Sequence, residues 1–173
     1  MKYKRGLSGV ITALILITLT LVAVVMVWGI VKSTITPSIE KSEACFGNFD
    51  KVTINDEFTC YLDPDGLNNV QVQFSISIAD IDVDDVLVSI LAGGESKSYE
   101  LTNELESIGL EDYSTGDTTV KLPGKNSGKT YIAEGFSEIP VSIKIAPTIK
   151  GNRCEISDTF YFQPIVDDCR ALA

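Results

Sequence analysis

The sequence predicts an α+β protein, in which one N-terminal hydrophobic, transmembrane α-helix is followed by a β-rich antiparallel sandwich head. Three observations lead to this prediction. Residues 7–31 contain no charge, and a helix needs about 20 apolar residues to cross a bilayer. Beyond residue 52, apolar residues alternate with polar ones in several short runs, as in strands with one buried face. Four cysteines all lie beyond the apolar run, which is typical of disulfides in an exported domain.

The apolar run must be helical if it lies in lipid, because every backbone amide there has to be satisfied within the segment. Lys2, Lys4 and Arg5 precede it, and Lys32 is the first charge after it. The positive-inside rule therefore places the N-terminus in the cytoplasm and the remainder outside the cell. The run also exceeds the roughly 7–15 apolar residues of a removable secretory signal, and no small-residue cleavage site follows it.

The junction before the run reads Lys-Arg-Gly-Leu-Ser-Gly-Val at residues 4–10. It resembles the class III signal peptide of archaeal type IV pilins and archaellins, and the resemblance covers about the first 32 residues. It implies that a prepilin peptidase cuts after Gly6, so that Leu7 becomes the first residue. Ile11 occupies the position where bacterial pilins carry Glu, which fits the archaeal type. An uncleaved signal anchor, for which the basic cluster is only a topology signal, is the alternative.

Four segments are expected along the chain: a leader at 1–6, a transmembrane or filament-core helix at 7–36, a stalk at 37–51 and an extracellular sandwich head at 52–173. Pro37 disfavours helix at the residue before it and predicts a kink or an end. With Gly47 soon after, the stalk is expected to be a short, broken helix.

The head is predicted from short strands with few helical patterns, which is typical of a β-sandwich. Strands are expected at residues 58–62, 70–78, 86–91, 96–101, 120–122, 130–133, 141–146 and 155–162. A turn is expected at 63–66, which reads Asp-Pro-Asp-Gly, and one or two helical turns at 103–110.

The cysteines fit two disulfides, with three possible pairings. Cys60 follows Cys45 by 15 residues, and Cys169 follows Cys154 by 15. Local pairs, Cys45 with Cys60 and Cys154 with Cys169, would each close a loop worth about 3 kcal/mol and are the favoured pairing. Pairing Cys45 with Cys169 would instead tie the ends of the head together. A zinc site is disfavoured, because the chain has neither a Cys-x-x-Cys motif nor any histidine.

The charge and the remaining motifs favour no chemistry. The net charge is −10, and it becomes −13 without the three cations of residues 1–6, so nucleic acid is excluded as a partner. Residues 124–130 resemble a P-loop but lack its spacing and its helix, which predicts a hairpin loop. An acidic cluster lacks a complete calcium motif and is expected to be a solvated turn; it contains Asp80, Asp82, Asp84 and Asp85. We expect no enzyme activity, cofactor or metal.

The resemblance implies a structural subunit of an archaeal type IV pilus-like surface filament. Its partners would be other copies of itself, the membrane, the prepilin peptidase and the assembly machinery. The precursor would lie in the cell membrane with its head outside, and the assembled form in a cell-surface filament. The alternative is a signal-anchored extracellular binding or adhesion domain, and the state of the bond between Gly6 and Leu7 distinguishes the two.

Overall fold

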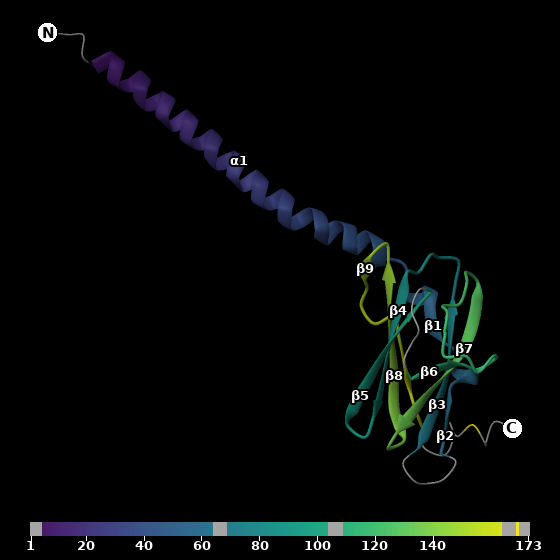
Figure 1. The fold of residues 1–173 in the computed structure, drawn as a ribbon. Coiled ribbons are helices and arrows are strands. Elements are labelled where there is room, and N and C mark those ends of the chain that lie inside the picture. Colours follow the sequence, from purple (N-terminus) through teal and green to yellow (C-terminus); the bar gives the residue numbers. More distant parts are fainter. Residues whose placement is uncertain (1–4, 64–68, 104–108, 164–168, 170–173) are drawn as a thin grey trace. The chain divides into compact units, whose positions relative to one another are not determined.

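The computed structural model describes residues 5–63, 69–103, 109–163 and 169 (Figure 1). The chain divides into two compact units, Met1–Ser42 and Glu43–Ala173. The first contains most of the helix α1 (Arg5–Cys45). The second is the head, which begins with the last turn of α1. The structure is therefore α+β, with a long apolar helix preceding antiparallel sheets, as predicted.

The helix α1 is 41 residues long and exceeds the predicted range of 7–36 at both ends. It continues past Pro37 to Cys45, so the helix does not end at Pro37, and the prediction of a short, broken stalk helix was wrong. Proline removes one backbone hydrogen bond from a helix interior and costs about 3 kcal/mol. Such a cost is local, and the helical turns on both sides of Pro37 keep their own hydrogen bonds.

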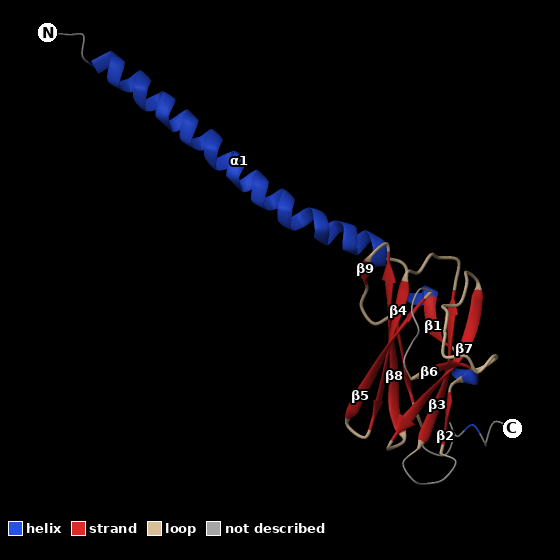
Figure 2. Ribbon diagram, viewed as in Figure 1, coloured by secondary structure: helices blue, strands red, loops and turns tan. Residues whose placement is uncertain are grey.

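The head consists of short 3₁₀ helices and antiparallel strands, which Figure 2 distinguishes by colour. The 3₁₀ helices are η1 (Phe49–Lys51) and η2 (Asp56–Phe58). The strands are β1 (Val52–Ile54), β2 (Cys60–Leu62), β3 (Val70–Ile78), β4 (Asp85–Ala92), β5 (Glu95–Thr102), β6 (Leu110–Asp112), β7 (Ser127–Phe136), β8 (Pro140–Ile149), β9 (Asn152–Arg153) and β10 (Asp158–Tyr161).

These strands form two five-stranded sheets. Sheet A has the order β1-β3-β7-β6, and β2 also pairs with β3. Sheet B has the order β10-β8-β4-β5, and β9 also pairs with β8. Every pairing between the described strands is antiparallel. A hydrogen bond of 2.9 Å from the Ile54 amide to the Asp158 carboxylate connects β1 of sheet A to β10 of sheet B.

One hydrophobic core lies between the sheets, because the inward residues of both belong to the same buried cluster. Phe74 and Tyr131 of sheet A are fully buried, and their ring centroids lie 5.5 Å apart. Val88 and Ile143 contribute from sheet B, also fully buried. Along β3 the buried residues alternate with more exposed ones except at Ser75, which is buried as well. The head is thus a β-sandwich.

Most strand predictions agree with the structure, but the short strands β1, β6 and β9 were not predicted. Strand β3 has the predicted bounds, and β4 and β5 form the predicted hairpin around Gly93 and Gly94. Both glycines have positive φ, as a two-residue hairpin turn requires. Residues 120–122 are not a strand, although Val120 and Leu122 are buried. The turn predicted at 63–66 and the helical turns predicted at 103–110 fall mostly outside the described residues.

Candidate functional site

The helix α1 exposes apolar side chains on all its faces. The large apolar residues from Val10 to Ile30 each expose at least 52% of their surface. The segment Gly9–Thr34 has the length and composition of a membrane span. At 1.5 Å per residue, its 26 residues extend for about 39 Å, against a hydrocarbon core of about 30 Å. A surface of this kind is stable only against lipid or against other apolar helices.

Hydroxyl groups within this segment are satisfied by the helix itself. Thr18 donates to the carbonyl of Ile15 at 2.9 Å, and Thr20 donates to that of Ile17 at 2.8 Å. Ser33 makes the same kind of bond, at 3.0 Å, to a carbonyl three residues earlier. Because the donors already have partners, these polar residues add little to the cost of placing the helix in an apolar environment.

The predicted cleavage site lies at the beginning of α1. Arg5 is the first residue of the helix, and Gly6 and Leu7 follow it in the first turn. Lys2 and Lys4 lie outside the described residues. The first turn contains no acidic residue, and a positive charge near a helix N-terminus opposes the helix dipole. Its first amides lack helical partners and it contains a glycine, and both features weaken a helical turn.

The other end of α1 is embedded in the head. Ala44 and Cys45 are buried, exposing 5% and 8% of their surfaces. The Asn48 side chain donates to the carbonyl of Ala44 at 2.8 Å and its amide donates to that of Cys45 at 3.2 Å. Gly47 has φ +83°, the left-handed conformation that commonly ends helices. Gly47, rather than Pro37, therefore marks the end of the helix.

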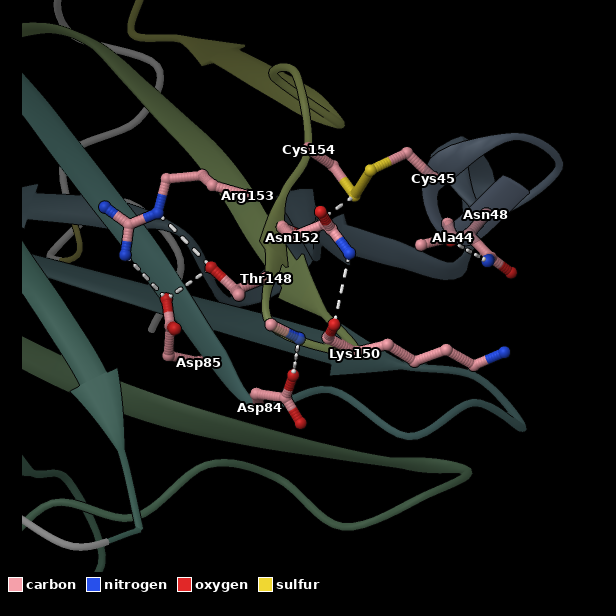
Figure 3. Close-up of a disulfide and its surroundings, with 11 residues drawn as sticks. Ala44, Cys45, Asn48, Asp84, Asp85, Thr148, Lys150, Asn152, Arg153 and Cys154 are labelled. Carbon is pink, nitrogen blue, oxygen red and sulfur yellow. Dashed lines mark hydrogen bonds and ion pairs between the residues drawn. A yellow bond between two sulfur atoms is a disulfide. The ribbon is translucent and has the colours of Figure 1, made fainter. Parts of the chain in front are cut away.

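A disulfide joins this last helical turn to the strand region of sheet B (Figure 3). Cys45 pairs with Cys154, which directly follows β9, and their Cα atoms are 5.5 Å apart. Ile149 of β8 is buried in the same small cluster. The last turn of α1 therefore has two covalent routes into the head, one through the main chain at Phe46 and one through Cys154.

The second disulfide joins Cys60 of β2 to Cys169, with a Cα separation of 5.2 Å. Both disulfides span 109 residues, so the prediction of two local pairs was wrong. The physical reason is the course of the chain along β3. Val52 pairs with Ile78, whereas Cys60 pairs with Gln73, so the chain moves along β3 and carries Cys60 away from Cys45.

Charged residues near Cys154 fix the β8–β9 hairpin (Figure 3). Arg153 forms an ion pair with Asp85 at 2.9 Å and another with Glu100 at 2.5 Å. The hydrogen bond to Glu100, assisted by the charge of Asp85, raises the pKa of the Arg153 guanidinium. The amide of Gly151, at the tip of the hairpin, donates to the Asp84 carboxylate at 2.7 Å. These contacts hold Cys154 in place for its partner.

Residues of the acidic cluster and of the P-loop-like segment form ion pairs and hydrogen bonds within the head. Asp84 and Asp85 bind the hairpin, and Asp82 forms an ion pair with Lys125 at 2.8 Å. The structure places no group of three potential metal ligands within the part of the chain that it describes. Residues 127–130 belong to strand β7, so a strand, as expected, stands where a P-loop would have its helix. The hairpin predicted around this loop does not form, because residues 120–122 are not a strand and β7 pairs instead with β3 and β6.

Comparison of the chain with models of known protein families, with curated proteins and with solved structures finds no match. The structure itself indicates a membrane anchor or a signal sequence at the N-terminus, from the apolar helix. The two disulfides indicate an extracellular location. The predicted site residues that the structure describes lie in two places. Arg5, Gly6 and Leu7 are at the start of α1, and the four cysteines form the two disulfides of the head. The Arg153 network was not predicted, because Asp85 and Glu100 are each more than 50 residues from Arg153 in the sequence.

Proposed function

We propose that this chain is a structural subunit of an archaeal type IV pilus-like surface filament. The membrane-held precursor is cleaved after Gly6 and assembles through its N-terminal helix. The observation that carries the proposal is the exposure of apolar side chains on every face of Gly9–Thr34. A helix that only anchors a protein contacts lipid, whereas a helix with apolar side chains on every face can also pack against copies of itself. The role requires neither catalysis nor a cofactor.

The positions of the charges explain why cleavage would permit assembly. Uncut chains would bring Lys2, Lys4 and Arg5 into a bundle of apolar helices, where an unpaired charge costs several kcal/mol. Cleavage after Gly6 removes all three cations and leaves one amine. The prepilin peptidase would act on the weak first turn of α1, and the assembly machinery would then extract the subunit from the membrane.

Small residues along α1 support close packing between helices. A Cβ added at Gly9 or at Gly29 would meet nothing within 4 Å, so both positions leave open space beside the helix. Small residues let apolar helices approach closely and gain van der Waals contact. The two covalent routes at Cys45 support a structural role as well, because a load on the helix would reach sheet B through Cys154 and sheet A through the main chain.

A second candidate is a permanently anchored extracellular binding domain. The observation that favours it is a polar groove on sheet A, lined by exposed aromatic side chains. The two functions differ in the fate of the leader, which an anchor keeps and a filament subunit loses.

The test is the N-terminus of the protein isolated from the native membrane and surface fractions, measured by intact mass and terminal sequencing. The filament proposal expects chains that begin at Leu7 and sediment as filaments. Gly6→Val should block processing and assembly, whereas the matched variant Gly9→Val should still be cleaved. Surface protein that still begins at Met1 would overturn the filament proposal in favour of the anchored domain.

A further inference from the structure

The outer face of sheet A carries a polar groove made of two adjoining hollows. One measures about 450 Å³ and the other about 310 Å³, both within the usual size range of ligand sites. Ser77 and Gly128 line both hollows. Ser77 follows the fully buried Ile76 on β3 and so points away from the core. The groove therefore crosses the solvent side of β3 and β7.

The floor of the groove bears small, hydroxylated side chains. Ser75, Ser77 and Thr130 line the larger hollow with Gly128 between them. A Cβ at Gly128 would lie 3.2 Å from the Ser77 hydroxyl oxygen and 3.6 Å from a backbone carbonyl, so a larger side chain would narrow the passage between the hollows. Each hydroxyl can both donate and accept hydrogen bonds. Such a floor suits a ligand that itself carries many hydroxyl groups.

Two exposed aromatic side chains line the larger hollow above this floor. Phe58 exposes 53% of its surface and Tyr113 exposes 58%. Each is held by backbone hydrogen bonds: the Phe58 amide donates to the carbonyl of Asn55 at 3.3 Å, and the Tyr113 amide donates to that of Thr130 at 3.1 Å. Exposed rings on a fixed backbone offer flat apolar surfaces that lose little entropy when a ligand packs on them.

The two charged residues that border the groove, Asp112 and Lys129, are paired with each other on the core side of sheet A, because Asp112 lies opposite the buried Tyr131 and Lys129 lies opposite the buried Ile76. Asp112 and Lys129 form an ion pair of 2.5 Å, and the Asp112 residue exposes only 5% of its surface. Burial would raise the pKa of Asp112, but hydrogen bonds from Lys129 and Ser114 outweigh it and lower the pKa to about 2. The pair therefore stays ionised and adds no net charge. Because the chain as a whole carries −10, an anionic ligand would be repelled.

We propose that this groove binds a neutral carbohydrate. The apolar faces of the sugar rings would pack on Phe58 and Tyr113, and the sugar hydroxyls would bond to the hydroxyl groups of the floor. Two connected hollows suit an oligosaccharide better than a single sugar. A peptide strand is disfavoured, because it would need a free sheet edge and β3 and β7 are hydrogen-bonded on both sides. The inference does not depend on filament assembly.

The test uses the full chain in a detergent without sugar headgroups. Saturation-transfer difference NMR and calorimetry would measure binding of neutral gluco-, manno-, galacto- and N-acetylglucosamine oligosaccharides, with oligogalacturonate as the anionic probe. We expect at least one neutral oligosaccharide to bind. Phe58→Ala and Tyr113→Ala should each weaken its affinity about five- to tenfold.

Tyr161→Ala is the matched control, because Tyr161 exposes 66% of its surface but lies on β10 of sheet B. It should bind like the unaltered protein. Since all three aromatic residues are exposed, the variants should melt like the parent. Absence of binding to every neutral probe, preference for oligogalacturonate, or an equal loss of affinity in Tyr161→Ala would each overturn the proposal.

Discussion

The helix exposes apolar side chains of the same kinds that the head buries. Val22 in α1 exposes 53% of its surface, whereas Val88 in β4 exposes none. The head buries its apolar residues between two sheets of its own chain. The helix buries almost none of them within the chain, so its apolar surface has to be covered by something else. Exposure of large apolar residues along a whole element therefore indicates the medium that the element requires.

This difference separates what stabilises each region. The head depends on its core and its disulfides, which are present whatever surrounds it. The helix hydrogen-bonds its own backbone, but the free energy of its side chains depends on lipid or on neighbouring helices. Changes in one region should consequently leave the other nearly untouched, and Trp28, the only tryptophan in the chain, gives the helix its own fluorescence signal.

The largest effect is expected from removing the disulfide between Cys60 and Cys169. It closes a loop of 109 residues, and loops of about 100 residues correspond to about 4.7 kcal/mol in the chain-entropy treatment. Cys60→Ala combined with Cys169→Ala should lower the free energy of unfolding of the head by about 4 kcal/mol, measured by urea denaturation followed by near-UV circular dichroism. Trp28 fluorescence should not change. An unaltered midpoint would show that this disulfide does not constrain the unfolded head.

Phe74→Ala should have a slightly smaller effect. Phe74 is fully buried against Tyr131, and truncating a buried phenylalanine costs about 3–5 kcal/mol. Leu21→Ala is the matched control, because Leu21 exposes 60% of its surface and should change the stability of the head by less than about 0.5 kcal/mol. Equal effects in the same denaturation experiment would contradict the separation of the two regions.

The sequence predicts well those elements whose pattern is local. The uncharged run of α1 and the alternation along β3 each depend on one stretch of residues, and both agree with the structure. The prediction at Pro37 was wrong because the local preference of proline against helix does not outweigh the hydrogen bonds of the helical turns on both sides of it. Gly47 was a better signal, since the helix ends where a glycine can take a positive φ.

Pairings between distant segments could not be predicted in the same way. The equal spacing of the cysteines is compatible with local pairs and with the observed pairs, because both long pairs span the same 109 residues. Cys45 and Cys60 are kept apart because β1 and β2 pair with different parts of β3. The groove on sheet A was missed for a similar reason, because its aromatic residues, Phe58 and Tyr113, lie on segments that the fold alone brings together.

Lysine substitutions at two similarly exposed valines sharpen the comparison further. Val22 lies near the middle of α1 and Val141 lies on β8, with exposures of 53% and 51%. Val22→Lys should cost about 3 kcal/mol in membrane insertion, since that is the cost of a lysine near the centre of a spanning helix. Val141→Lys should leave both insertion and head stability almost unchanged. Glycosylation-site mapping of inserted and non-inserted chains measures the difference, and equal insertion would show that α1 does not require lipid.

The smallest predicted effect concerns acid and belongs to the head alone. The pKa of Asp112 is lowered from 3.8 to about 2, so its ionised form stabilises the fold. The contribution is fully present above about pH 4 and is lost as the pH falls toward 2, and it amounts to about 2 kcal/mol.

Asp112→Asn tests the sign of this effect. The variant should be less stable than the parent at neutral pH, because it loses the charged hydrogen bonds to Lys129 and Ser114. Its stability curve should approach that of the parent as the pH falls toward 2, where the parent carboxylate becomes protonated. Asp117→Asn, at an exposed position nearby, is the control. Curves that stay parallel from neutral pH to pH 2 would mean that the Asp112–Lys129 pair does not stabilise the head.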